Sequence, residues 1–431
     1  MTPQPDGSQP DPPPRPRPRG LARVVGAGVV TGAADDDPSA IGTYASAGAL
    51  FGFAFLWIAP VLLPMMYVVV YLSAKIGRVY GKGLFAAIRD RYSPLLLWPL
   101  MIGACLGNII EAAANLGGMG AAINLLLPIP IALIVVGVAM IVVLLQLFGS
   151  YELIRRIFRW LALILFAYVA AALLARPDPA EVLRATIMPR IRWNSEFLMM
   201  IVACIGTSLS AYVYTWQSNQ EVEEQIAEGK RRWWQRRGAT RRELARTRRD
   251  VIVGMLFSNI ILYFVILSTG ATLHDAGITR IDTAAQAAAA LEPLAGGGAK
   301  LLFALGVVGV GFLAVPVMTT GAAYDLVQGL GGEGSLHQHV GEAWLFYSII
   351  FLVTLVAVAL NFLGFNPMRA LVWSGIVQGF SVPPLLLLMM LMTNDRKLMG
   401  AQPNGRLTNL LGWTTTGVTA AATLCLVGTW L

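Results

Sequence analysis

The stretch that decides the fold is Thr31-Gly32-Ala33-Ala34-Asp35-Asp36-Asp37-Pro38-Ser39-Ala40-Ile41-Gly42-Thr43. It interrupts an apolar run that extends from about residue 21 to about residue 50. Pro38 lacks a backbone donor and its ring clashes with the preceding turn, so a helix that reaches Asp37 should break there and free the carbonyl groups around Ala34 and Asp35. Freed carbonyl groups beside carboxylates form a site for a cation.

An alternative reading places the three aspartates at the membrane edge, as a helix cap before a span that begins at Ala40. The residues from Gly20 to Ala34 argue against it, because they are apolar apart from Arg23 and no loop-like interval separates them from Ala40. Ionised side chains at such a depth are costly and usually functional. We expect at least one of the aspartates to lie within the membrane, and which one faces the ion stays open.

The composition places the rest of the chain in a membrane as well. Of its 431 residues, 56% are hydrophobic and only 13% are charged, and the mean hydropathy is +0.65. So little charge cannot cover a soluble surface of this size. A helical span needs roughly 20 mostly apolar residues. Eleven such segments are predicted, at 21–50, 52–75, 94–124, 128–148, 157–175, 196–220, 250–270, 299–328, 343–363, 367–393 and 407–430.

The basic residues indicate the orientation of these segments. If the N-terminus is cytoplasmic, only seven of the 32 lysines and arginines fall outside: Arg176, Arg184, Arg190, Arg192, Arg280, Lys300 and Arg369. The positive-inside rule then predicts an inner (plasma) membrane protein with an extracytoplasmic C-terminus. Residues 1–20, rich in proline and arginine, read as a disordered cytoplasmic tail. The charge follows the loops and forms no folded basic face, which argues against nucleic acid as a partner.

A second polar interruption, Gly206-Thr207-Ser208-Leu209-Ser210-Ala211-Tyr212, lies five segments after the first. Broken helices at matching positions of two halves are typical of inverted-repeat transporters. We therefore predict an all-α integral membrane protein with eleven transmembrane helices, of which the first and sixth are broken. The first repeat would cover 21–175 (helices 1–5) and the second 196–393 (helices 6–10), with helix 11 at 407–430.

Segment three adds Asn108, Glu111 and Asn115, which are three and four residues apart and share one helix face. They read either as a polar path for cations or protons or as hydrogen bonds between helices. Likewise, the hydroxyl groups of segment six either supply oxygen ligands or bond to the preceding turn.

The chain shows no ATP-binding, dinucleotide-binding, nucleophile-elbow or zinc-protease motif in a suitable context. It therefore reads neither as an enzyme nor as an ATP-driven pump. The cysteines Cys105, Cys204 and Cys425 lie in apolar stretches without metal-ligand spacing, and the methionines of the spans read as packing. No cofactor and no obligate protein partner are expected.

At the two interruptions the sequence resembles the Nramp divalent-metal transporters, which share the inverted-repeat fold of the LeuT type. The family motif Asp-Pro-Gly-Asn, followed by Phe-Ala-Thr-Asp-Ile-Gln-Ala-Gly-Ala, is matched by Asp37-Pro38 and by Ala47-Gly48-Ala49. Near the end of segment ten, Pro383, Pro384 and the run 393–400 are similar to the family's Leu-Pro-Phe and its Met-Gly ending. The resemblance implies transport of a divalent cation by alternating access.

The departures from the family pattern bear on the ion. The family's metal-binding Asn falls at Ala40, its segment-six Ala and Met fall at Thr207 and Ser210, and its following His falls at Tyr212. Replacing a thioether by a hydroxyl leaves an oxygen-only site, which suits magnesium or manganese. In this respect the chain looks most like the Nramp-related magnesium transporter branch.

The family's segment-three Glu falls on Asn115, with Glu111 one turn earlier, and coupling to protons is therefore expected to be weak or absent. The metal is expected to bind directly to Asp37, and the negative charge of Asp36 is expected to strengthen the electrostatic field there. Three hydroxyl residues, Ser39, Thr207 and Ser210, are expected to supply oxygen ligands or to hold water. An adjoining polar path is expected from Glu111, Asn115, Tyr212 and Gln378.

Three other functions fit parts of the sequence. One is a proton-coupled manganese or iron importer of the standard family type, and another is an amino-acid symporter with the same fold. The third is a membrane receptor or scaffold that binds without moving ions. The ion and the lipid bilayer are the partners that the sequence implies.

Overall fold

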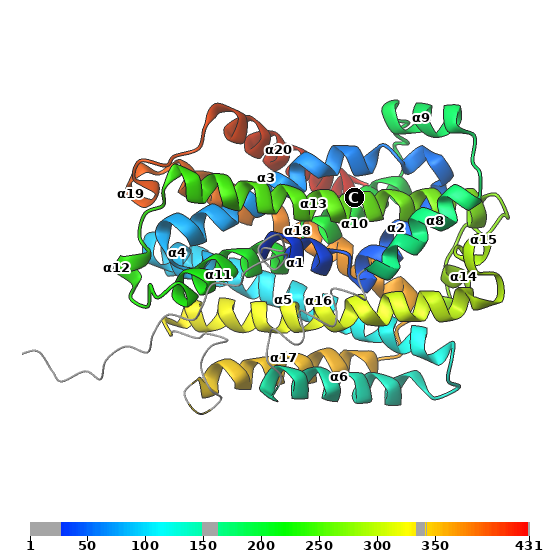
Figure 1. Cartoon of the computed structure of the whole chain (residues 1–431), viewed down its shortest axis with the longest axis horizontal. Coiled ribbons are helices and arrows are strands. Elements are labelled where there is room, and N and C mark those ends of the chain that lie inside the picture. The colour runs from blue at the N-terminus through cyan, green and yellow to red at the C-terminus, as the bar shows by residue number, and fades with distance from the viewer. Residues whose placement is uncertain (1–26, 149–162, 333–340, 342, 430–431) are drawn as a thin grey trace, which may run out of the picture.

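The computed structural model describes residues 27–148, 163–332, 341 and 343–429. Within them the chain forms a bundle of long helices (Figure 1). Eight stretches of the described chain are helical, long and apolar enough to cross a membrane: Ile58–Tyr80, Pro94–Asn124, Ser195–Ala227, Arg241–His274, Glu292–Leu330, Trp344–Asn361, Pro367–Asn394 and Arg406–Gly428. These confirm an all-α protein built to span a membrane.

The other three predicted segments are also helical but shorter. The first is split into α1 (Ala27–Asp35) and α2 (Pro38–Phe51), and the fourth is α6 (Ile131–Phe148). The fifth begins outside the described residues and continues as η3 (Leu163–Leu165) and α8 (Phe166–Leu174). The predicted tail, 1–20, also lies outside the described residues, and the division into two repeats stays a prediction.

The remaining long helices are α3 (Ile58–Tyr80), α5 (Pro94–Asn124), α10 (Ser195–Ser208), α11 (Ala211–Ala227), α13 (Arg241–Thr269), α16 (Ala299–Leu330), α17 (Trp344–Asn361), α18 (Pro367–Asn394) and α20 (Arg406–Gly428). Short helices connect them: η2 (Gly52–Phe55), α4 (Leu84–Arg91), α9 (Pro179–Ile187), α12 (Trp233–Arg236), η4 (Gly270–His274), α14 (Ala284–Ala289), α15 (Glu292–Ala295), η5 (Gly296–Gly298) and α19 (Arg396–Met399).

The seventh segment begins nine residues before its predicted start at residue 250, because the basic loop becomes helical at Arg241. Thr240 caps this helix: its hydroxyl accepts the Glu243 amide at 3.2 Å, and the Glu243 carboxylate accepts the Thr240 amide at 2.7 Å. Such reciprocal capping starts a helix in water-exposed sequence. Hydropathy alone missed these first turns because they are charged.

The broken segments occupy the middle of the bundle. Figure 1 shows α1 and α18 near its centre, whereas α6 and α17 run side by side along one edge. The helix α1 packs on α13, α10 packs on α18, and α5 packs on both α16 and α18. Large apolar side chains such as Leu133, Phe351 and Leu424 are exposed on outer helices, as expected of a surface in contact with lipid.

Glycines allow two of these helix pairs to approach closely. A Cβ at Gly206 of α10 would lie 2.8 Å from the Cα of Gly379 on α18, and one at Gly32 of α1 would lie 2.9 Å from the Cα of Gly254 on α13. Small residues at such crossings let the two backbones touch. The resulting van der Waals packing holds the helices together in lipid, where the hydrophobic effect does not drive their association. Each broken segment is thereby fixed to an unbroken one.

The α10–α18 contact makes a testable prediction. Gly206→Ala should destabilise the protein by about 1–3 kcal/mol, because the added methyl group would meet backbone atoms that have no rotamer to change. The measurement is the thermal midpoint of the detergent-solubilised protein. Gly137→Ala on α6 is the matched control, since a Cβ there meets no atom within 4 Å. Equal midpoints for the two variants would show that this crossing does not require glycine.

Candidate cation-binding site

The first break leaves Asp36 and Asp37 between two helices. Helix α1 ends at Asp35 and α2 begins at Pro38, so Asp37 stands at the N-cap with extended backbone angles, φ −69° and ψ 169°. Its Oδ1 accepts the amide of Ala40 at 2.6 Å, a capping bond for one of the free amides at a helix start. All three aspartates have no exposed surface, so the cap lies in the interior of the protein.

The second oxygen of Asp37 is held by a side chain from α5. Asn115 donates from Nδ2 to Asp37 Oδ2 at 2.7 Å, and its Oδ1 accepts the Ser39 amide at 2.8 Å. One asparagine therefore spans the break. Each carboxylate oxygen of Asp37 receives one of these hydrogen bonds, which leaves acceptor capacity for a cation.

Asp35 and Asp36 turn toward α13, where Ser258 was not indicated by the sequence. The Ser258 Oγ lies 2.8 Å from Asp35 Oδ2 and 2.8 Å from Asp36 Oδ1. A hydroxyl carries a single proton and can donate to only one of them. The remaining oxygens, Asp35 Oδ1 and Asp36 Oδ2, are buried without a hydrogen-bond partner among the described residues. This pair therefore has oxygens free to accept a cation.

The second break lies between the end of α10 at Ser208 and the start of α11 at Ala211. The Ser210 hydroxyl lies 3.0 Å from Glu111 Oε1 and 2.9 Å from the Gly206 carbonyl. Gln378 of α18 donates to Glu111 Oε2 at 2.7 Å and accepts the Ala211 amide at 3.3 Å. Two residues of the predicted path, Glu111 and Gln378, thus form hydrogen bonds with polar groups at this break.

Direct hydrogen bonds join the two breaks. The Tyr212 hydroxyl donates to the Ala34 carbonyl at 2.9 Å, so this carbonyl, predicted to be freed, is used by α11. On the other side of the breaks the Tyr44 and Ser208 hydroxyls lie 2.6 Å apart. The four helix ends therefore meet at one place, with Asp37 in it.

Two predicted oxygen donors differ in their surroundings. The Ser39 hydroxyl lies 2.9 Å from the Leu371 carbonyl and 2.7 Å from the Ser374 hydroxyl, so it faces α18. The Thr207 hydroxyl is buried and has no hydrogen-bond partner in the described part of the chain. Of the two hydroxyls, Thr207 is therefore the one that keeps its hydrogen-bonding capacity.

A methionine outside the predicted set also reaches this region. The Sδ of Met318 on α16 lies 3.2 Å from Asn115 Nδ2, the atom that also bonds Asp37. In the described ranges no group of three or more His, Cys, Asp or Glu side chains converges as a metal cluster. An ion at Asp37 would thus depend on carboxylate, hydroxyl and carbonyl oxygens, with this thioether nearby.

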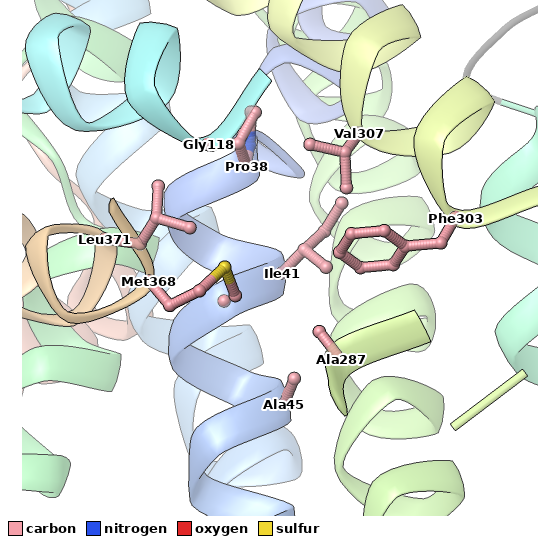
Figure 2. A pocket seen from close by; sticks show the side chains of 10 residues that line it. Pro38, Ile41, Ala45, Gly118, Ala287, Phe303, Val307, Met368 and Leu371 are labelled. Carbon is pink, nitrogen blue, oxygen red and sulfur yellow. The ribbon is translucent and has the colours of Figure 1, made fainter. Parts of the chain in front are cut away.

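The site is closed off from solvent, because Asp37 has no exposed surface. An apolar cavity beside α2, just past the break, is lined by Pro38, Ile41, Phe303 and Val307 among others, and Figure 2 shows Ile41 facing Phe303. At the opposite end, Gln217 and Glu221 of α11 are buried. Arg78 lies 2.6 Å from Glu221 and also pairs with Glu224, so ion pairs hold this part of α11 against α3.

Comparisons with known proteins bear on the family and the fold. The family model described as natural resistance-associated macrophage protein-like (Nramp) matches residues 28–429. A divalent metal cation transporter MntH from Klebsiella pneumoniae is 28% identical over 384 residues, which cover 88% of this chain and 87% of the relative.

Solved structures support the fold. A manganese transporter from Eremococcus coleocola, with a bound aromatic bis-isothiourea compound, matches with a TM-score of 0.71 at 18% identity, over 95% of this chain and 88% of that one. The transporter MhsT with L-phenylalanine matches with a TM-score of 0.60 at 9% identity, over 94% and 98% of the two chains. Both likenesses concern the fold alone.

Asn115 offers a direct test of the site. Asn115→Ala should weaken binding of Mn²⁺ about 10- to 100-fold, the usual effect of removing a group that orients a ligand. Isothermal titration of the purified protein measures it. Asn124→Ala on the same helix is the control, because the Asn124 side chain bonds only the Ile129 carbonyl at an exposed position. An unchanged affinity in Asn115→Ala would place the ion elsewhere.

Proposed function

Since the chain belongs to the Nramp family, whose model matches residues 28–429, we propose that it is a secondary transporter that carries divalent metal cations by alternating access. The observation that carries the proposal is the fully buried Asp37 carboxylate at the junction of two broken helices. A charged group buried at such depth is costly and is usually retained for an ion pathway.

The donor set at the junction favours a hard ion. The carboxylates of Asp36 and Asp37 and the hydroxyl of Thr207 are oxygen donors, which magnesium and manganese prefer. Three groups are already committed to hydrogen bonds with other helices, namely the hydroxyls of Ser39 and Ser210 and the side chain of Gln378. We therefore assign them to holding the site or its water and not to the first contact with the ion.

Weak or absent coupling to protons follows from the same residues. The positions at which the family pattern has a glutamate and a histidine carry Asn115 and Tyr212 here. Neither is ionised near neutral pH. Glu111 is the nearest carboxyl on α5, but its two oxygens are occupied by Ser210 and Gln378.

The orientation follows from the basic residues. Arg78, Arg89, Arg236 and Arg241 mark one end of the bundle, which we call the basic end and assign to the cytoplasm by the positive-inside rule. In an inner membrane the C-terminus would then lie outside. We propose the bilayer and the metal ion as its partners, and transport without catalysis as its role.

One observation favours a second candidate, a manganese and iron importer of the standard type. Thioethers prefer softer metals, and Met318 brings one to Asn115 from α16. An amino-acid symporter fits less well, because an anionic substrate carboxylate would meet the buried aspartates of the first break. Flux measurements separate all of these from a receptor that moves no ion.

The central test is uptake into proteoliposomes. Asp37→Asn should reduce Mn²⁺ and Mg²⁺ uptake at least about tenfold, because it removes the charge at the meeting point of the breaks while keeping the side chain's size. Glu181→Gln, an exposed carboxylate on α9, is the control and should transport normally. Wild-type uptake in Asp37→Asn would contradict the proposed site, and no uptake by the wild type would contradict the function.

The choice of ion is tested by adding a thioether at one position and removing one at another. Ser210→Met restores the residue type of the family pattern and should raise Cd²⁺ uptake relative to Mg²⁺ by about tenfold, since cadmium prefers sulfur. Met318→Leu should leave the wild-type ratio unchanged. If Met318→Leu instead abolishes Cd²⁺ uptake, the α16 thioether is a ligand and the importer reading replaces the hard-ion proposal.

A further inference from the structure

Asp325 on α16 is a buried carboxylate that the cation site does not use. Its side chain has no exposed surface, and both carboxylate oxygens lack a hydrogen-bond partner among the described residues. Of the other buried carboxylates discussed above, Asp37, Glu111 and Glu221 each accept at least one hydrogen bond, and Asp35 and Asp36 share the Ser258 hydroxyl. Asp325 therefore needs an explanation that a structural role does not supply.

The residues around Asp325 belong to the neighbouring helices α5 and α11. The Thr215 side chain of α11 interacts with the carboxyl group without meeting hydrogen-bond geometry. The carboxyl group also acts electrostatically on the Tyr214 hydroxyl of α11 and the Cys105 thiol of α5. The Tyr214 hydroxyl is itself buried without a hydrogen-bond partner in the described structure. Two polar groups without partners thus share one interior region between α5, α11 and α16.

Several charged groups on the helices around α16 are bonded to other residues. Arg89 of α4 donates to the Gln328 carbonyl at 2.7 Å, and Glu223 of α11 accepts from Tyr324 at 2.7 Å. The full set on these neighbours is Asp35 (α1), Tyr44 (α2), Arg89, Asp90 and Arg91 (α4), Cys105 and Glu111 (α5), Tyr212, Tyr214, Glu221, Glu223 and Glu224 (α11), Glu292 (α15) and Tyr347 (α17). Glu111 of α5 is bonded to Ser210 within the cation site, and Glu221 of α11 is paired with Arg78.

An ionised carboxylate in such a place would cost several kcal/mol, because no group in the described part of the chain donates a hydrogen bond to replace its lost hydration. A divalent metal ion is poorly suited to neutralise this carboxylate, since hard divalent cations take about six oxygen ligands. A proton needs only one carboxylate oxygen. We propose that Asp325 is a proton-binding site that is occupied while the bundle is closed at its basic end.

The position of Asp325 connects it to that closure. It follows Met318 by seven residues, so it lies about 10 Å further along the same face of α16, toward the basic end. One turn on, Gln328 donates to Asn219 of α11 at 2.6 Å. Together with the Tyr324–Glu223 and Arg89–Gln328 bonds, this contact joins α16 to α11 and α4. Separation of these helices would admit water to Asp325.

Proton binding therefore favours the closed form. Neutral Asp325 is stable in the closed form, where the interior is dry, and ionised Asp325 is stable in the open form, where water reaches it. A rise in pH therefore shifts the bundle toward opening at the basic end. A single proton changes this equilibrium by at most about tenfold per pH unit. The inference rests on the proposed alternating access, but it concerns the closure and not the metal ligands.

Cys105 provides a reporter that does not depend on metal transport. In full-length protein carrying Cys204→Ala and Cys425→Ser, N-ethylmaleimide labelling of Cys105 is measured from about pH 6 to about pH 8 and divided by the rate in denatured protein, which removes the intrinsic reactivity of the thiol. The normalised rate should rise at least about threefold across this range. It should be low and flat in Asp325→Asn, which imitates the neutral acid.

Three comparisons make the result decisive. Asp325→Glu should keep the rise, and Asp275→Asn, an exposed carboxylate beyond the far end of α13, should behave as the parent protein. A flat profile in the parent, or the same rise in Asp325→Asn, would overturn the proposal. Should Asp325→Asn fail to fold by size-exclusion chromatography, the parent and Asp325→Glu profiles still decide. Mn²⁺ uptake by the parent is recorded separately, so a failure of transport is distinguished from a failure of this inference.

Discussion

Inside a membrane every backbone amide and carbonyl must find a partner within the protein, and this constraint shapes the whole centre of the molecule. Two helices stop halfway, and each break exposes backbone groups that no helix satisfies. Side chains from unbroken neighbours supply the partners: Asn115 bonds the Ser39 amide, and Gln378 bonds the Ala211 amide. The polar groups required to close the breaks are the same groups that surround Asp37. The site is therefore a consequence of breaking helices in a place without water.

Much of this arrangement was predictable from the sequence. Pro38 lacks the amide that would continue the preceding helix and instead opens α2, and the spacing of the two polar interruptions indicated which segments would meet. The third segment was predicted at 94–124, as observed. The matching family model confirms the resemblance seen in the Asp-Pro and Ala-Gly-Ala motifs. These features are predictable because each depends on local chain chemistry or on hydrophobic length.

The residues that sequence did not indicate have another property in common. Ser258, Met318 and Asp325 are single side chains in long helices, and only the rotation of the helix decides whether each faces lipid, a neighbour or the site. Ser39 shows the converse: it stands beside Asp37 in sequence, yet its hydroxyl faces α18. Packing of glycine against glycine, as at Gly206 and Gly379, sets such rotations. Side-chain direction in a helix bundle is therefore a tertiary property that no single segment encodes.

The same bonds bear on how the proposed alternating access would open the site. Because side chains already cap the broken ends, tilting a half-helix at its break disturbs few backbone hydrogen bonds. On the basic side, α1 and α11 are tied together by the Tyr212–Ala34 bond and by Thr31, which donates to Gln217 at 2.6 Å. Either half-helix moving alone would leave these buried groups unpaired, at about 1–3 kcal/mol each. Opening at the basic end is therefore cheapest when α1 and α11 move as a pair, away from the unbroken helices α5 and α16.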